Sequence, residues 1–246
     1  MPASNRRTEE IMDAIKRIIV DEGLRPGDPL PTETRLCEQL GAARTSIREA
    51  LRQLEALHIV SATRGKGTFV GSLSLDPLVQ TLALRSIIDS REGFSGLLQV
   101  VEVRRYLDLG CAEQVVANLH GTPQPHLEEL VSQMMTLAQE GKSFQDQDIV
   151  FHLGLLAATP NMVVKQLIHS LWLVHQVVVP QLGLKIADRL VDTACAHRTL
   201  LDAALAGDVD AYRDAVLAHY EPLEEILRDS MSTPSAPAPS APTSLH

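Results

Sequence analysis

Two helical segments on either side of Gly41 constrain the fold of this chain most strongly. A first helix precedes them, because the apolar residues of 9–22 recur at helical spacing. A second helix is expected from its N-cap, Thr32, to about Leu40. Gly41 interrupts this pattern, and a third helix is expected to begin at about Thr45. Two helices separated by a glycine are typical of a helix-turn-helix.

A glycine-tipped hairpin completes the N-terminal unit. Residues 58–60 and 68–70 have the pattern of two short strands, joined by a polar turn that contains Gly65 and Gly67. Helices followed by such a hairpin have the order of a winged helix-turn-helix. The sequence therefore predicts a winged domain over residues 1–75.

Only helical patterns follow this unit, so the chain is predicted to be mainly α. Seven helices are expected in an all-α antiparallel bundle over residues 76–230, with Gly, Pro or polar residues between most of them. Pro180 should kink or shorten its helix. Residues 231–246 are rich in Pro, Ala and Ser and are expected to form a disordered tail. The expected helices cover residues 76–90, 95–119, 124–140, 144–158, 161–183, 186–206 and 208–229.

Charge is divided unevenly between the two parts of the chain. Residues 1–75 hold 11 basic and 10 acidic side chains, which leaves 11 basic and 21 acidic residues for 76–246. The net charge of −9 therefore comes from the second part. DNA binding by the first part requires its arginines to gather on one face.

Several features favour a reducing, cytoplasmic location. The three cysteines lie far apart and form no CxxC pair. The N-terminus lacks the apolar core of a signal peptide. The most apolar stretch, 171–184, is interrupted by polar residues and a proline, so no membrane span is expected.

The third helix begins with side chains suited to DNA. Arg44, Thr45, Ser46 and Arg48 occupy its first turns, and a recognition helix reads bases with its N-terminal residues. Arginine is the best bidentate partner for guanine, whereas Thr45 and Ser46 can cap the helix and bond phosphate. Arg52, one turn further along, can reach the phosphate backbone of the DNA. The alternative is an ordinary solvated helix face.

Residues 24–70 resemble the DNA-binding domain of the GntR family of bacterial regulators. The resemblance rests on three separated stretches in the right order: LRPGDPLPTETRL, ARTSIREALRQLEAL and GKGTFV. It implies that Arg44 and Arg48 are DNA-contacting arginines.

The same resemblance implies a wing tip and contains one departure. Gly65, Lys66 and Gly67 correspond to the tip of the wing, which approaches the minor groove. Many members have Arg where this chain has Thr34, and here Arg35 follows. Arg35 either takes over that contact with DNA or the contact is lost.

The helical part resembles the C-terminal domain of the FadR-type branch of this family. Its best motifs are VEVRRYLD, DIVFH and AHRTLLDAALAGD, followed by a late histidine. In many members an Asp and three His bind a divalent metal, and the matching residues are Asp148, His152, His197 and His219. Three His and one Asp suit zinc or nickel.

The spacing of these four residues is compatible with a site inside the bundle. Asp148 and His152 are neighbours on one helical face, and each of the four residues lies on an apolar stripe. The alternative is a set of hydrogen-bonded core histidines. The remaining histidines lack this support and are interpreted as structural or surface residues.

Arg104 lies in the middle of an apolar stripe and needs an anionic partner. Asp108, four residues later, offers a salt bridge. The resemblance instead favours an arginine that binds the carboxylate of an effector beside the metal. Both interactions can coexist.

These features predict a DNA-binding transcription regulator, expected to repress, and not an enzyme. A homodimer reading an inverted repeat in double-stranded operator DNA is expected, because one recognition helix covers only a few base pairs. The expected effector is a small organic acid whose carboxylate meets the metal and Arg104.

Three alternative functions stay open. The metal itself can be the signal, or a metal-bound water can serve a hydrolase. Against the hydrolase, the chain has no HExxH motif and no Gly-rich phosphate loop. A purely structural helical adaptor would leave the wing and the arginines of the third helix unexplained.

Overall fold

The computed structural model describes residues 3–90, 95–182 and 189–232. The chain divides into two compact units, Met1–Leu78 and Val79–His246. The first combines helices with a two-stranded sheet, and in the second every described element is a helix. The predicted mainly α architecture, a winged helix-turn-helix followed by a helical bundle, is confirmed.

The N-terminal unit packs around the third helix, since α1, α2 and β1 all contact α3. Its core is apolar and includes Ile15, Leu36, Ile47 and Leu54. The strands pair antiparallel, with Val60 opposite Val70. The elements are α1 (Ala3–Asp21), α2 (Glu33–Leu40), α3 (Arg44–Ala56), β1 (Val60–Thr63) and β2 (Gly67–Val70).

The ends of α2 follow the sequence. The hydroxyl oxygen of Thr32 accepts a hydrogen bond from the backbone N–H of Arg35 at 3.3 Å, as an N-cap does. Gly41 ends the helix at a φ of 57°, a left-handed conformation that favours glycine.

Two local predictions were wrong. The N-cap of α3 is Ala43, without a side-chain hydrogen bond, because the helix begins at Arg44 and places Thr45 and Ser46 inside its first turn. The first strand begins at Val60 and not at residue 58, because His58 has a φ of 57° and cannot continue an extended strand.

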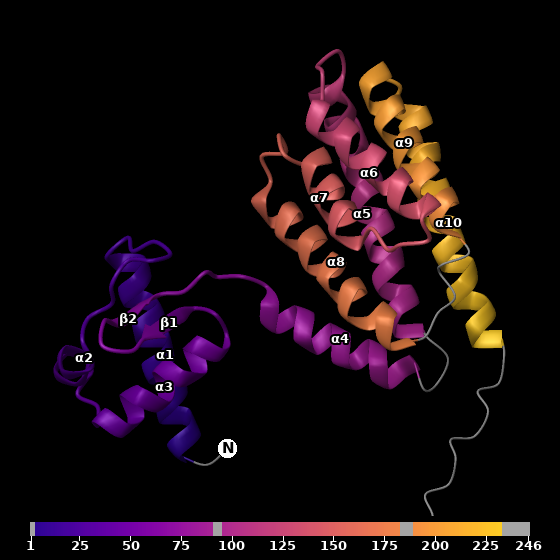
Figure 1. Ribbon diagram of the computed structural model, residues 1–246. Helices are drawn as coiled ribbons and strands as arrows, with labels where there is room; N and C mark the ends of the chain where they lie inside the picture. The colour runs from indigo at the N-terminus through magenta and orange to yellow at the C-terminus, as the bar shows by residue number, and fades with distance from the viewer. Residues whose placement is uncertain (1–2, 91–94, 183–188, 233–246) are drawn as a thin grey trace, which may run out of the picture. The chain divides into compact units, whose positions relative to one another are not determined.

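Seven helices form the rest of the described chain (Figure 1). Pro180 lies inside α8, which runs to Leu182, and α10 extends to Ser232, beyond the predicted end at 229. Residues 186–188 of the predicted ninth helix and residues 233–246 of the predicted tail lie outside the described residues. The helices are α4 (Asp76–Ser90), α5 (Ser95–Leu119), α6 (Pro125–Gln139), α7 (Gln145–Leu155), α8 (Met162–Leu182), α9 (Leu190–Ala206) and α10 (Val209–Ser232).

Helix α5 lies at the centre of the bundle and contacts α8, α9 and α10, while α6 packs against α7 and α9 (Figure 1). Helix α8 contains a stretch, Met162–Gln181, whose length and composition would suit a membrane span. Val174 and Val178 of this stretch are fully buried in the bundle. A core helix of a soluble protein passes the same test, so the stretch is weak evidence for a membrane span.

Candidate metal centre and nucleic-acid interface

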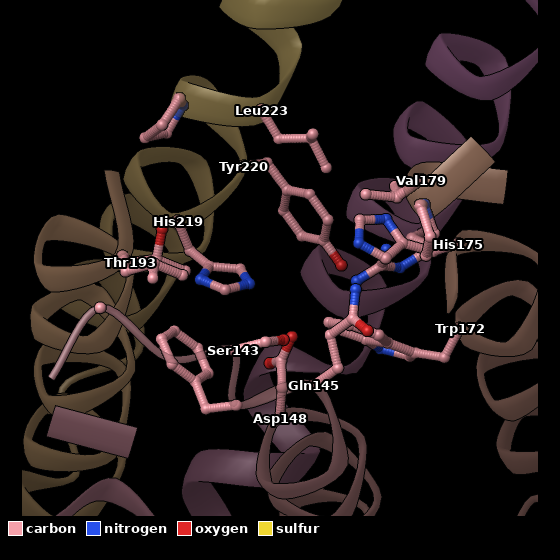
Figure 2. Close-up of a pocket in the computed structure, with 16 residues that line it drawn as sticks. Ser143, Gln145, Asp148, Trp172, His175, Val179, Thr193, His219, Tyr220 and Leu223 are labelled. Carbon is pink, nitrogen blue, oxygen red and sulfur yellow. The ribbon is translucent and has the colours of Figure 1, made fainter. Parts of the chain in front are cut away.

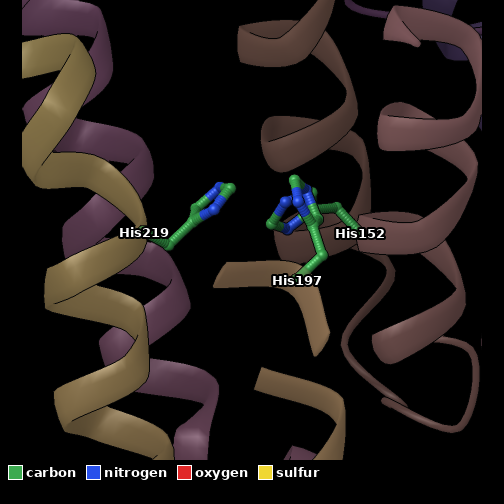
Figure 3. A group of neighbouring side chains, drawn as sticks. All are labelled: His152, His197 and His219. Atoms are coloured by element: carbon green, nitrogen blue, oxygen red, sulfur yellow. The ribbon is translucent and has the colours of Figure 1, made fainter. Parts of the chain in front are cut away.

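The structure brings the four expected metal ligands together inside the bundle. Helix α7 supplies Asp148 and His152, α9 supplies His197 and α10 supplies His219, and all four side chains are buried. One ring nitrogen from each histidine lies within 4.8 Å of the others (Figure 3). The Oδ1 atom of Asp148 lies 2.6 Å from Nε2 of His197 and 3.4 Å from Nε2 of His152.

The hydrogen bonds of His197 leave a place for a cation. Its Nδ1 lies 2.7 Å from the carbonyl oxygen of Thr193 and must donate there, because a carbonyl only accepts. Its Nε2 then faces the carboxylate of Asp148, another acceptor, so a second proton or a metal ion is needed between them. In addition, Nε2 of His152 and Nδ1 of His219 are buried without a hydrogen-bond partner. Three imidazole nitrogens and a carboxylate oxygen form a ligand set that suits a borderline divalent ion.

Electrostatics favour the metal-binding protonation states of two of these residues, Asp148 and His219. Burial alone would raise the pKa of Asp148, but His197 and His152 lower it well below its usual value. Burial lowers the pKa of His219 well below its usual value, and the neighbouring His197 and His152 add to this effect. An ionised carboxylate and a neutral imidazole are the forms that bind a metal.

Arg104 is buried, with 2% of its surface exposed, and the salt bridge that Asp108 could supply is not formed. Asp108 instead accepts a hydrogen bond from the hydroxyl of Tyr220 at 2.6 Å. No carboxylate of the described residues forms an ion pair with Arg104, and its Nε and Nη1 atoms have no hydrogen-bond partner. Its guanidinium carbon lies 3.4 Å from the ring centroid of Trp172.

A cavity of about 440 Å³ joins Arg104 to the cluster. Figure 2 shows Asp148, His219 and Tyr220 directed towards it. Its lining comprises Arg104, Gly141, Ser143, Phe144, Gln145, Asp148, Trp172, His175, Val179, Pro180, Leu190, Thr193, His219, Tyr220, Pro222 and Leu223. The cavity has the size and mixed lining of a small-molecule site.

Sequence reasoning missed the wall that α8 contributes to this cavity. Trp172 and His175 are both buried and line it, although His175 was interpreted as structural or surface. Burial, with a contribution from Arg104, lowers the pKa of His175 to about 3, so its ring is neutral near pH 7. Their spacing of three residues places them on one helical face, a signal that could have indicated a polar wall.

Other histidines lie away from the cluster. His58 Nδ1 lies 2.7 Å from the hydroxyl oxygen of Ser74, and His120 Nδ1 lies 3.3 Å from the carbonyl oxygen of Leu205. His126 and His169 are exposed.

The DNA-reading residues predicted in α3 lie on the surface of the first unit. Arg44, Thr45 and Arg48 are exposed and Ser46 is partly exposed. Nε of Arg48 donates to both carboxylate oxygens of Glu33, at 2.9 and 3.1 Å. Because surface ion pairs contribute little free energy, Arg48 can exchange this pair for a contact with a DNA phosphate at a small cost in free energy.

Thr34, where many family members have Arg, contacts the first residue of α3. Arg44 Nη2 donates to the hydroxyl oxygen of Thr34 at 3.0 Å, and Arg35 is exposed beside it on α2. At the hairpin tip Gly65 and Gly67 have φ values of 78° and 111°, which favour glycine, and Lys66 between them is exposed.

Comparison with protein families gives two matches. Residues 7–70 match the model described as bacterial regulatory proteins, gntR family, and residues 99–222 match the FCD domain. The second match alone covers half of the chain.

Individual proteins are similar along most of their length. The galactonate operon transcriptional repressor of Escherichia coli K12 is 25% identical over 211 residues, 86% of this chain and 92% of the relative. The HTH-type transcriptional regulator LutR of Bacillus subtilis 168 is 25% identical over 218 residues, 83% of this chain and 93% of the relative. A solved structure, Streptococcus agalactiae GntR, aligns with a TM-score of 0.63 and 25% identity over 89% of this chain and 99% of that chain.

Proposed function

The chain belongs to the gntR family of bacterial regulatory proteins and is a DNA-binding transcription regulator with an FCD domain, and on this premise we propose that a metal-dependent organic acid controls its binding to DNA. The protein acts in the cytoplasm as a homodimeric repressor that reads an inverted repeat in operator DNA. The observation that carries the proposal is the unpaired Arg104 beside a buried Asp/His cluster and a shared cavity.

The metal site consists of Asp148, His152, His197 and His219, and zinc or nickel suits these donors. A bound divalent ion supplies positive charge that attracts an anion. The chain itself keeps Asp148 ionised and His219 neutral, as their lowered pKa values require. Both side chains are buried in the bundle.

The effector is a small carboxylate. The fork of Arg104 is suited to a carboxylate and has two nitrogens without a hydrogen-bond partner. One relative is named for a galactonate operon, and galactonate is a hydroxy acid, which supports the inclusion of sugar acids in a screen. To change DNA binding, the acid must bind one conformation of the protein more tightly than another.

Operator DNA binds to the exposed start of α3. Arg44 and Arg48 read bases, Thr45, Ser46 and Arg35 contact phosphate, and Lys66 reaches the minor groove from the tip formed with Gly65 and Gly67. Two copies are needed for specificity, since one helix reads only a few base pairs.

A thermal-shift screen tests the effector class. Hydroxy, keto, dicarboxylic and sugar acids are added to zinc-loaded protein, and each acid that stabilises the wild type is repeated on Arg104→Met and His197→Ala. We expect the shift to be lost in both variants while Arg104→Met still binds operator DNA. Stabilisation by neutral compounds alone, or equal shifts in Arg104→Met, would overturn the carboxylate clamp.

The metal as the signal is the second candidate, because three histidine nitrogens converge within 4.8 Å without requiring an anion. Titration of operator binding with zinc, with and without organic acids, separates the two functions. A response to zinc alone favours the metal signal. The relatives are named as regulators, which supports a non-enzymatic role.

A further inference from the structure

Trp172 is the only tryptophan of the chain, and it touches both parts of the proposed site. The guanidinium carbon of Arg104 lies 3.4 Å from its ring centroid. The ring of His152, a proposed metal ligand, lies against the same indole with centroids 4.7 Å apart and an interplanar angle of 35°. Nε and Nη1 of Arg104 lack hydrogen-bond partners, and of its two aromatic neighbours Trp172 is nearer to the guanidinium carbon than Tyr220, whose ring centroid is 5.4 Å away.

We infer that Trp172 is a positioning residue that fixes the charge of Arg104 beside the metal cluster and thereby couples cation binding to anion binding. The inference rests on the proposed metal site and goes beyond it, because it assigns a role to a side chain that is neither a ligand nor an anion contact. An arginine has several rotatable bonds, and a cation–π contact selects one of its conformations.

The charge of Arg104 reaches the cluster. The guanidinium carbon of Arg104 and the ring of His152 lie against the same indole, 3.4 and 4.7 Å from its ring centroid. Arg104 and His219 also line the same cavity. A positive charge at the cluster is therefore opposed by Arg104, and a metal ion experiences the same repulsion until an anion neutralises the guanidinium.

This arrangement predicts linkage between the two ligands. Metal binding is weaker in the absence of the anion, and the anion binds more tightly to the metal-loaded protein, because coupling between two ligands is reciprocal. If the indole is replaced by a side chain without an aromatic face, Arg104 can turn away from the cluster. The repulsion and the linkage then both decrease.

A double-mutant cycle on zinc affinity tests the inference without an effector. Zinc affinity is measured by competition with a chelator in the wild type, Arg104→Met, Trp172→Met and the double variant. We expect Arg104→Met to tighten zinc binding about tenfold in the wild-type background, as a like charge within the site would require, and less than about threefold in the Trp172→Met background. Trp172→Phe, which keeps an aromatic face, should restore most of the tenfold effect.

Val174→Ala provides the matched control, because Val174 is buried on the same helix and does not line the cavity. The tenfold effect of Arg104→Met should persist in that background. A second measurement does not depend on the folding of Trp172→Met. The emission spectrum of the single tryptophan should shift in Arg104→Met and stay at the wild-type position in Val174→Ala.

The outcomes separate this inference from the proposed function. Failure of the wild type to bind zinc, nickel or manganese would eliminate the metal site, and the coupling with it. Zinc binding with a full tenfold effect in Trp172→Met would overturn only the role of Trp172. An emission spectrum that is the same in the wild type and Arg104→Met would do so as well.

Discussion

The two units of the molecule hold their charged groups in opposite ways. In the winged unit, Arg44, Arg48 and Lys66 are exposed to solvent. In the bundle, Arg104 and Asp148 are buried, and nitrogen atoms of Arg104 and of three histidines have no hydrogen-bond partner. An exposed cation costs little free energy, whereas a buried unpaired polar atom costs about 1–3 kcal/mol. The difference indicates a surface ready to bind DNA and a cavity that becomes more stable when its ligands arrive.

The largest expected effect is that of Asp148→Ala on the bundle. Removal of this carboxylate should weaken zinc binding at least about 100-fold and abolish the stabilisation of the protein by zinc. Asp146→Ala, on the exposed face of the same helix, is the control. Equal increases in Tm on zinc addition in both variants would show that Asp148 is not a ligand.

The matching change in the winged unit is Arg44→Ala or Arg48→Ala. Each should weaken specific operator binding by about 1–3 kcal/mol if the arginine reads a base. Zinc affinity should stay unchanged, since the change lies in the other unit. Arg17→Ala, an exposed arginine on α1, is the control in a gel-shift titration. Wild-type binding by both α3 variants would refute the assignment of the recognition helix.

Acid should destabilise the bundle through its buried histidines. The pKa of His175 falls from 6.5 to about 3 on folding, so the stability that its neutral form contributes is complete above pH 6.5 and decreases as the pH falls towards 3. Between pH 7 and pH 5 the metal-free protein should lose about 2 kcal/mol of unfolding free energy through this group, at about 1.4 kcal/mol per pH unit.

Urea unfolding of metal-free protein at the two pH values measures this loss. His175→Gln should lose less stability than the wild type between pH 7 and pH 5. His126→Gln, at an exposed position, should behave as the wild type does. An identical loss in His175→Gln and the wild type would show that His175 is not held neutral by the bundle.

The smallest expected effect belongs to Glu33→Gln. Glu33 pairs with Arg48 in the free protein, across a contact with side-chain exposures of 34% and 55%. Such surface pairs contribute about 0–1 kcal/mol, so release of Arg48 should tighten operator binding by no more than about fivefold. Weaker binding by Glu33→Gln in the same titration would mean that Glu33 itself contacts the operator.

Local signals predicted the helices well, because helical spacing and caps such as Thr32 depend on neighbouring residues. Features other than helical spacing and caps explain the errors. The left-handed backbone of His58 delays the first strand, and no short motif encodes it. Likewise, Asp108 accepts a hydrogen bond from Tyr220, which lies 112 positions later in the chain, and it does not pair with Arg104.

The candidate site shows the same division. The spacing of Asp148 and His152 indicated a shared helical face, but their convergence with His197 and His219 depends on the packing of three helices. Arg104 of α5 stacks on Trp172 of α8. This contact could not be predicted from the sequence, because the periodicity within one helix does not indicate which other helix packs against it.

The most direct test of the account is the affinity for operator DNA as a function of metal and acid. A labelled duplex from upstream of the gene is titrated by fluorescence anisotropy with zinc-loaded protein, in the absence and presence of the acid that gives the largest thermal shift. We expect the acid to change the operator Kd at least about tenfold, within the usual range of allosteric coupling, and to have no effect on metal-free protein or Arg104→Met. An operator Kd that the acid leaves unchanged in zinc-loaded wild type, or changes equally in Arg104→Met, would contradict the account.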